Sequence, residues 1–105
     1  MKEKDYLITR ELRKRVSLAA KIVDFRVFGS RARGDEDEYS DMDIFIEVEM
    51  LNQEIKEKIS TIVWEVGFEY YTLISPLIFT RNEIEKSPLR ASPIVRNIMA
   101  EGIAV

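Results

Sequence analysis

Residues 27–48 read VFGSRARGDEDEYSDMDIFIEV, and the pattern of this stretch changes twice. The apolar run that enters it stops at Gly29 and Ser30, and a segment dense in charge follows. The chain then returns to an alternating apolar pattern through Asp41 and Asp43. A strand, a polar connection and a second strand are therefore predicted, with polar side chains gathered where the strands meet the connection.

Asp41 and Asp43 open the second of these strands. Side chains two residues apart on a strand point to the same side, with Cα atoms roughly 6–7 Å apart. Two carboxylates at this spacing can converge on a hard cation such as Mg²⁺, which also accepts phosphate oxygens. A bare pair of aspartates is more often a solvated loop end than a metal site, so the pair gains meaning only from its neighbours.

Gly29 and Ser30 supply those neighbours. Glycine allows positive φ and a close approach of backbone to a ligand, and the serine hydroxyl adds a donor. A turn followed by a short helix start would aim backbone N–H groups at an anion. Arg31 and Arg33 follow directly, and guanidinium groups match phosphate oxygens in geometry.

The combination is more specific than its parts. Gly29-Ser30, ten intervening residues and then Asp41-x-Asp43 resemble the signature of the nucleotidyltransferase superfamily related to DNA polymerase beta. The runs GSRARG and SDMDI more closely resemble the minimal nucleotidyltransferases, small proteins of which many are antitoxin partners of HEPN-domain toxins. The resemblance is sharpest over residues 27–47.

The resemblance implies a set of roles. Asp41 and Asp43 would be the catalytic carboxylates and would bind Mg²⁺, with ATP as the nucleotide donor. The triphosphate would be held by Gly29 and Ser30, with Arg31 and Arg33 near its phosphates. The acceptor would be a hydroxyl, such as a tyrosine on a HEPN-type toxin, and the chain would then act as an antitoxin.

One element of the superfamily pattern is missing. Active members usually carry a third carboxylate on a neighbouring strand, where it helps to hold metal and deprotonates the acceptor. The corresponding position in this chain is near Ser75, and Glu69 is the only carboxylate in residues 68–79. At about 3.3 Å per residue Glu69 would lie roughly 20 Å along a strand from Ser75, so activation of the acceptor must come from elsewhere.

The composition excludes several kinds of catalytic and metal-binding residue. The 105 residues are 46% apolar and 33% charged, which is typical of one globular domain covering 1–105. The sequence has no Cys and no His, which excludes thiolate or histidine metal ligands and a histidine base. A net charge of −3 does not favour nucleic acid as a partner. We also see no signal peptide and no run of membrane-spanning length, so a cytoplasmic protein is expected.

The periodicity predicts an α+β fold, a small mixed sheet with helices packed on it. We expect a helix over 1–20, strands over 22–28 and 42–49, a helix over 51–66 and a strand region over 68–79.

Single residues refine this outline. Gly67 is expected to cap the second helix and Trp64 to lie at the edge of the core. Glu47 is expected to be solvated, and Pro76 to mark a sheet edge or bulge. Thr80 is expected to open a short helix through a capping box.

Towards the C-terminus, Ser87-Pro88 should end that short helix. A last helix should start at Ser92-Pro93 and stop at Gly102, after which residues 103–105 trail off. Earlier in the chain, the acidic run 35–38 is expected to be a solvated loop tip.

Two other functions remain open. The missing carboxylate also suits a non-catalytic module that neutralises a partner protein by contact. A Mg²⁺-dependent modifier of nucleic-acid ends is a third possibility, which the net charge does not favour. Because the chain is too short for a separate domain over the base, a partner or a homo-oligomer could complete the site.

Overall fold

The computed structural model describes residues 1–35 and 39–105. Within these residues, four strands form one sheet in the order β3-β2-β1-β4. The strands are β1 (Ile22–Phe28), β2 (Met42–Val48), β3 (Ile74–Thr80) and β4 (Ile103–Ala104). β1 is antiparallel to β2 and β4, whereas β2 and β3 are parallel. The predicted α+β class with a mixed sheet is confirmed.

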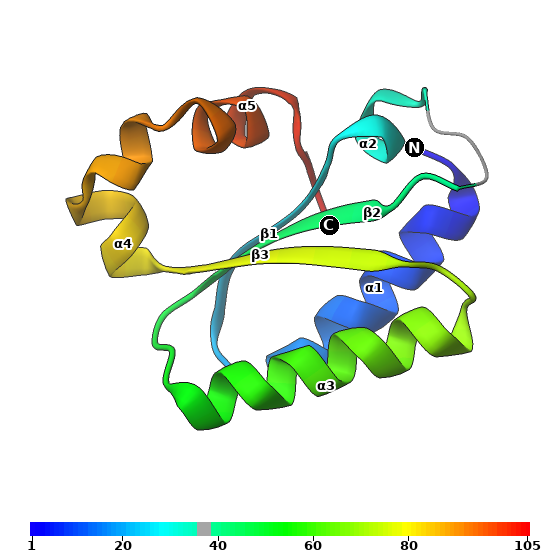
Figure 1. The fold of residues 1–105 in the computed structure, drawn as a ribbon, viewed down its shortest axis with the longest axis horizontal. Coiled ribbons are helices and arrows are strands. Elements are labelled where there is room, and N and C mark those ends of the chain that lie inside the picture. Colours follow the sequence, from blue (N-terminus) through cyan, green and yellow to red (C-terminus); the bar gives the residue numbers. More distant parts are fainter. Residues whose placement is uncertain (36–38) are drawn as a thin grey trace.

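Helices cover the two faces of the sheet unequally (Figure 1). The long helices α1 (Glu3–Ser17) and α3 (Gln53–Glu69) lie together on one face. On the other side lie the short α2 (Ser30–Arg33), α4 (Arg81–Lys86), the 3₁₀ turn η1 (Pro88–Ala91) and α5 (Pro93–Glu101). Within the described residues, no helix has the length and apolar composition that a membrane span requires.

The main core lies between the sheet and the two long helices. Every second side chain of β1 and β2 points into it, because alternate strand residues face opposite sides. Its buried members come from α1, both central strands, α3 and the start of β3: Ile8, Leu12, Val16, Phe25, Val27, Met42, Ile44, Ile46, Val48, Ile59, Val63, Val66 and Ile74.

The other face of β2 is also buried beyond Asp43. Phe45 is fully buried, and its ring lies 5.8 Å from that of Phe79 on β3. Glu47 is only 6% exposed, so the expectation that it is solvated was wrong. The alternation of β2 revealed which side chains share a face, but it could not reveal that the acidic face would be covered.

The C-terminal half of α3 differs from the prediction. Gly67 lies inside the helix and not at its C-cap, and Phe68 belongs to the helix and not to the following strand. A Cβ on Gly67 would lie 2.7 Å from the Thr72 carbonyl oxygen, so glycine is needed where the chain folds back. Positive φ, the property expected of a capping glycine, is found at Tyr71 with φ +52°.

The prediction that Trp64 lies at the edge of the core was also wrong. Trp64 is 69% exposed, and its ring stacks on that of Phe68.

In the C-terminal third, the helix boundaries agree more closely with the prediction. Thr80 and Glu83 form the expected capping box, and Pro76 lies on the edge strand β3. α5 begins at Pro93 and ends before Gly102 as predicted. Residues 103–105 do not trail off, because Ile103 and Ala104 pair with β1. Of the predicted acidic loop tip 35–38, only the first residue lies within the described part of the chain.

Candidate nucleotide site

The turn at Gly29 brings backbone against a carboxylate. Gly29 follows β1 and precedes α2 with φ +75° and ψ −153°, a conformation that is essentially restricted to glycine. Phe28 pairs with Asp43 across the antiparallel ladder, so the turn and the start of β2 are adjacent. A Cβ added to Gly29 would collide with the Asp43 Oδ2 atom. The sequence-predicted turn and aspartate are therefore in contact because residue 29 has no side chain.

Asp41, Asp43 and Ser75 gather on two neighbouring strand starts. In the parallel register Asp43 lies opposite Ser75, and the Ser75 hydroxyl lies 3.2 Å from Asp41 Oδ2, to which it donates a hydrogen bond. The prediction that residue 75 occupies the position beside the aspartate pair is confirmed. Glu69 lies on α3 and binds Arg15 at 2.7 Å, so it does not replace the missing carboxylate.

The electrostatics of the pair favour a cation. Burial raises the pKa of Asp43 above its ordinary value, and the neighbouring Asp41 charge raises it further, whereas Arg33 lowers it. Desolvated carboxylates that repel one another gain most from a shared positive ligand. Within residues 1–35 and 39–105, no cluster of three or more Asp, Glu, His or Cys is placed to hold a metal. Two carboxylates suit Mg²⁺, which takes its remaining ligands from water and substrate phosphates.

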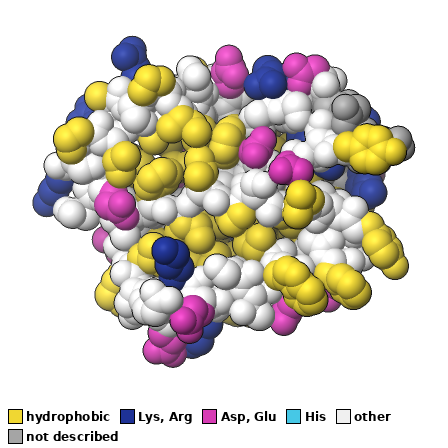
Figure 2. Space-filling view, viewed as in Figure 1, with side chains coloured by type: hydrophobic (Ala, Val, Ile, Leu, Met, Phe, Trp, Pro, Cys, Tyr) yellow, Lys and Arg dark blue, Asp and Glu magenta, His cyan; other side chains and the backbone are white. Residues whose placement is uncertain are grey.

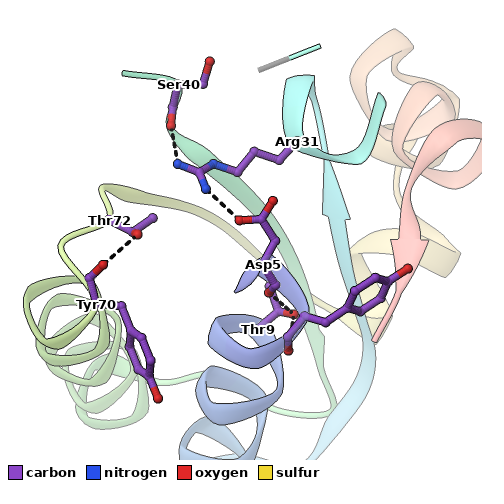
Figure 3. A network of polar contacts seen from close by, with 7 residues as sticks. Asp5, Thr9, Arg31, Ser40, Tyr70 and Thr72 are labelled. Atoms are coloured by element: carbon purple, nitrogen blue, oxygen red, sulfur yellow. Dashed lines mark hydrogen bonds and ion pairs between the residues drawn. The ribbon is translucent and has the colours of Figure 1, made fainter. Parts of the chain in front are cut away.

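Arg31 has a partner that the sequence did not predict. Its Nη1 lies 2.7 Å from Asp5 Oδ1 on α1, and its Nη2 donates to the Ser40 carbonyl oxygen at 2.8 Å (Figure 3). Asp5 is 1% exposed, which is unusual for a carboxylate. The Arg31 guanidinium thus ties α1 and α2 to the residue that precedes Asp41, while its contact with phosphate stays a prediction.

Two further polar atoms of this pair, Asp5 Oδ2 and Arg31 Nε, are buried without a hydrogen-bond partner among the described residues. No local signal could have singled out Asp5, because its partner lies 26 residues away in the chain.

Arg33 is more exposed to solvent than Arg31. It pairs with Asp35 at 3.2 Å, with both side chains about half exposed. Gly29 and Arg33 also line a cavity of about 240 Å³ that α5 closes. Its other lining residues are Phe28, Ile94, Asn97, Ile98 and Glu101. A concave space therefore begins at the predicted phosphate-binding turn.

Comparisons with known proteins identify the family to which the chain belongs. Residues 9–105 match the model of the nucleotidyltransferase domain family. A relative from Methanocaldococcus jannaschii, described as a candidate protein adenylyltransferase, is 42% identical over 77 residues. That match covers 70% of this chain and 78% of the relative. The chain belongs to the nucleotidyltransferase domain family, and the comparisons support nucleotidyltransferase activity.

Solved structures place it among the small members of that fold. A candidate minimal nucleotidyltransferase superposes with a TM-score of 0.66 at 20% identity, covering 99% of this chain and 97% of the other. A toxin–antitoxin structure with AMP-PNP gives a TM-score of 0.62 at 16% identity, covering 95% of this chain and 70% of the other. At these identities the likeness is one of fold.

A candidate nucleotidyltransferase from Sulfolobus solfataricus is more distant. It gives a TM-score of 0.53 at 16% identity, covering 99% of this chain and 87% of the other. The predicted nucleotidyltransferase family is thus confirmed, and the chain shares the fold of a candidate minimal nucleotidyltransferase.

Proposed function

We propose that this nucleotidyltransferase transfers AMP from Mg²⁺-bound ATP to a hydroxyl group of a protein partner. The observation that carries the proposal is the contact between the Gly29 backbone and the Asp43 carboxylate, with Asp41 beside it. Phosphate groups bound at the turn would lie next to a cation held by the carboxylates. Nucleotidyl transfer needs this arrangement of phosphate and metal.

Each residue has a separate role in this proposal. Asp41 and Asp43 hold Mg²⁺, which would neutralise charge on the phosphate oxygens as the transition state forms. The Ser30 hydroxyl and the backbone at Gly29 hold the terminal phosphates, and Arg33 adds positive charge at the same turn. Arg31 supports the site indirectly, through its ion pair with Asp5 and its hydrogen bond to the Ser40 carbonyl oxygen.

The proposed reaction is a displacement at the α-phosphorus. The acceptor oxygen forms a bond to that phosphorus, the bond to the β-bridging oxygen breaks, and pyrophosphate leaves. The acceptor proton passes to solvent or to a base on the partner, because Ser75 cannot serve as a base. General-base assistance typically contributes about 10²–10⁴-fold, so its absence slows the reaction without abolishing it.

The acceptor we favour is a tyrosine hydroxyl on a HEPN-type toxin, which would make the chain an antitoxin. Support for a protein acceptor comes from the Methanocaldococcus jannaschii relative, described as a candidate protein adenylyltransferase. Support for a toxin comes from the fold that the chain shares with a protein of a toxin–antitoxin complex.

A second function is favoured by one observation, the Ser75 hydroxyl beside Asp41, where the family resemblance leads us to expect a third carboxylate. The chain would then bind and neutralise its partner without transferring a nucleotide. The two functions differ in whether Asp41 and Asp43 are needed for protection of cells from the partner.

The first experiment is calorimetric titration of Mg·ATP into the wild type and into Asp41→Ala/Asp43→Ala. We expect saturable binding to the wild type that requires Mg²⁺ and is lost in the double variant. Asp24→Ala is the matched control, because Asp24 is a half-buried carboxylate on β1 that pairs with Arg26 at 2.8 Å. Equal binding to wild type and double variant would contradict the assigned site.

The second experiment uses ATP labelled at the α-phosphate with the co-expressed partner. We expect label on the partner with the wild type and none with Asp41→Ala/Asp43→Ala. A complex that forms without labelling, and a double variant that still protects cells, would favour the non-catalytic function.

A further inference from the structure

Large apolar side chains gather on the surface at the C-terminal end of α3 and in the loop that follows. Trp64, Phe68, Tyr71 and Leu73 are 69%, 68%, 94% and 70% exposed. The Trp64 and Phe68 rings are stacked, with centroids 5.5 Å apart and an interplanar angle of 11°. Figure 2 shows apolar side chains gathered in this part of the surface, close to acidic ones. We call these four residues the aromatic surface.

The aromatic surface borders a groove between α3 and the edge strand β3. The groove has a volume of about 530 Å³, which is within the range of specific binding sites. None of its lining residues carries a charge: Ser60, Val63, Trp64, Gly67, Phe68, Tyr71, Thr72, Leu73, Ile74 and Pro76. A contiguous apolar surface of this kind is typical of a protein interaction site.

The groove begins next to the strand starts that carry the carboxylate pair. The Leu73 carbonyl accepts a hydrogen bond from the Met42 N–H at 2.8 Å, between the two aspartates in sequence. Ile74 lines the groove, whereas Ser75, which donates to Asp41 at 3.2 Å, points to the other face of the sheet because successive strand residues face opposite sides. Only the edge strand β3 therefore separates a protein docked in the groove from the carboxylates.

The structure also restricts the form of the occupant. β3 is at the edge of the sheet, where another strand could in principle be added. Pro76 lies in the middle of β3 and has no N–H, so a strand laid along this edge would lose a hydrogen bond there. A wide apolar groove beside a helix favours an amphipathic helix instead.

Charge restricts its chemistry. Glu65 is an exposed neighbour of Trp64, no Lys or Arg lines the groove, and the chain carries a net charge of −3. A second copy docked symmetrically would bring Glu65 near its own copy, because a twofold interface uses the same surface twice. A partner with basic residues at the edges of its apolar face has the complementary charge.

We infer that the aromatic surface is the docking site of the acceptor protein, and that it takes an amphipathic helix with an apolar face flanked by Lys and Arg. The inference rests on the proposed function, since it concerns the acceptor of the same site. Docking here places the acceptor protein at the edge strand β3, next to the start of β2, where Asp41 and Asp43 lie.

Trp64 provides the measurement, because it is the only tryptophan in the chain. The probes are two Trp-free helical peptides of about 20 residues with the same leucine face, one flanked by Lys and Arg and the other by Glu. We expect the basic peptide to shift Trp64 fluorescence to the blue with saturation, and the acidic peptide to bind at least tenfold more weakly. Phe68→Ser and Leu73→Ser should each raise the Kd of the basic peptide about tenfold or more.

Leu18→Ser is the matched control, since Leu18 is an exposed leucine at the end of α1, and it should leave the Kd unchanged. Equal binding of the two peptides, or binding insensitive to Phe68→Ser and Leu73→Ser, would overturn the inference. Sedimentation showing a dimer that Phe68→Ser dissociates would also overturn it in favour of a second copy.

Mg·ATP titration of the same variants separates the inference from the proposed function. Phe68→Ser and Leu73→Ser should bind Mg·ATP like the wild type. Failure of the peptide assay alone would remove the docking site and leave the nucleotide site standing. If the wild type did not bind Mg·ATP, the proposed function would fail whatever the peptides did.

Discussion

At the scale of single residues, Gly29 and Gly34 form a natural comparison. Both flank α2 with positive φ, of +75° and +79°. A Cβ on Gly29 would collide with Asp43, whereas a Cβ on Gly34 would meet no heavy atom within 4 Å. We therefore expect Gly34→Ala to lower the free energy of unfolding by about 1–2 kcal/mol, the usual cost of a left-handed alanine.

We expect Gly29→Ala to be more destabilising than Gly34→Ala and to abolish Mg·ATP binding, because it also displaces the Asp43 carboxylate. Urea unfolding and calorimetric titration of both variants measure the two effects. Loss of nucleotide binding in Gly34→Ala as well would mean that backbone strain, and not the contact with Asp43, accounts for the defect.

Glu47 makes stability depend on pH. Burial raises the pKa of Glu47 above its usual 4.5, the charges of Asp24, Glu85 and Glu49 raise it further, and Arg81 opposes them. The folded state therefore holds this proton more tightly than the unfolded chain. That contribution to stability is present below about pH 4.5 and is lost as the pH rises through the raised pKa.

Gln mimics the protonated form, so Glu47→Gln should become more stable relative to the wild type as the pH rises from about 4 to about 7. Urea unfolding at several pH values checks this. Glu54→Gln, at an exposed site on α3, controls for loss of a carboxylate charge. A difference between Glu47→Gln and wild type that does not change with pH would contradict the prediction.

At the scale of elements, the Asp5–Arg31 pair joins α1, α2 and the segment that leads into β2. The Asp5 side chain is 2% exposed and that of Arg31 is 13% exposed, so the pair is largely shielded from solvent. Removing one member of a buried pair leaves the other charge without compensation, at a cost of about 3–5 kcal/mol. We expect a loss of this size in Asp5→Asn, measured by urea unfolding.

We also expect weaker Mg·ATP binding in Asp5→Asn and in Arg31→Lys, because the Ser40 carbonyl next to Asp41 loses its fixed partner. The control is Arg15→Met, which breaks the more exposed contacts of Arg15 with Glu11 and Glu69. Arg15→Met should have a small effect on stability and none on nucleotide binding. Unchanged binding in Arg31→Lys would mean that the pair stabilises the fold without positioning Asp41.

The sequence predicted elements well where their causes are local. The turn at Gly29, the capping box at Thr80 and the Pro93 helix start each depend on neighbouring residues, and all three are present. The prediction failed at Gly67, where the reason for glycine is the approach of Thr72 after the chain reverses. It also missed β4, because two residues have no periodicity and only the partner strand β1 defines them.

The same distinction applies to the candidate site. Gly29, Ser30, Asp41 and Asp43 lie within fifteen consecutive residues, so their spacing carries the signal. The place of Ser75 could be estimated because the family pattern has a neighbouring strand beside the aspartate pair. Asp5 could not be predicted, since no sequence pattern connects an aspartate in the first helix with an arginine 26 residues later.

At the scale of the whole molecule, ligand binding should be visible as stability. A ligand that binds only the folded state at 100 times its Kd adds about 2.7 kcal/mol. For a chain of this size that corresponds to a rise in Tm of about 10 °C or more. We expect this rise with Mg·ATP, and its loss both with EDTA and in Asp41→Ala/Asp43→Ala. An equal rise in the double variant would indicate binding elsewhere.

The order of strands has a consequence for how the molecule opens. β1 and β2 lie inside the sheet and hold the Gly29 turn and both aspartates at one end. Backbone amides in central strands exchange with solvent only in the least frequent opening events. α4 and η1 can therefore open and close in native-state hydrogen exchange while the turn and the carboxylates stay assembled. A nucleotide bound there would be released by its own dissociation, and not by local unfolding of the molecule.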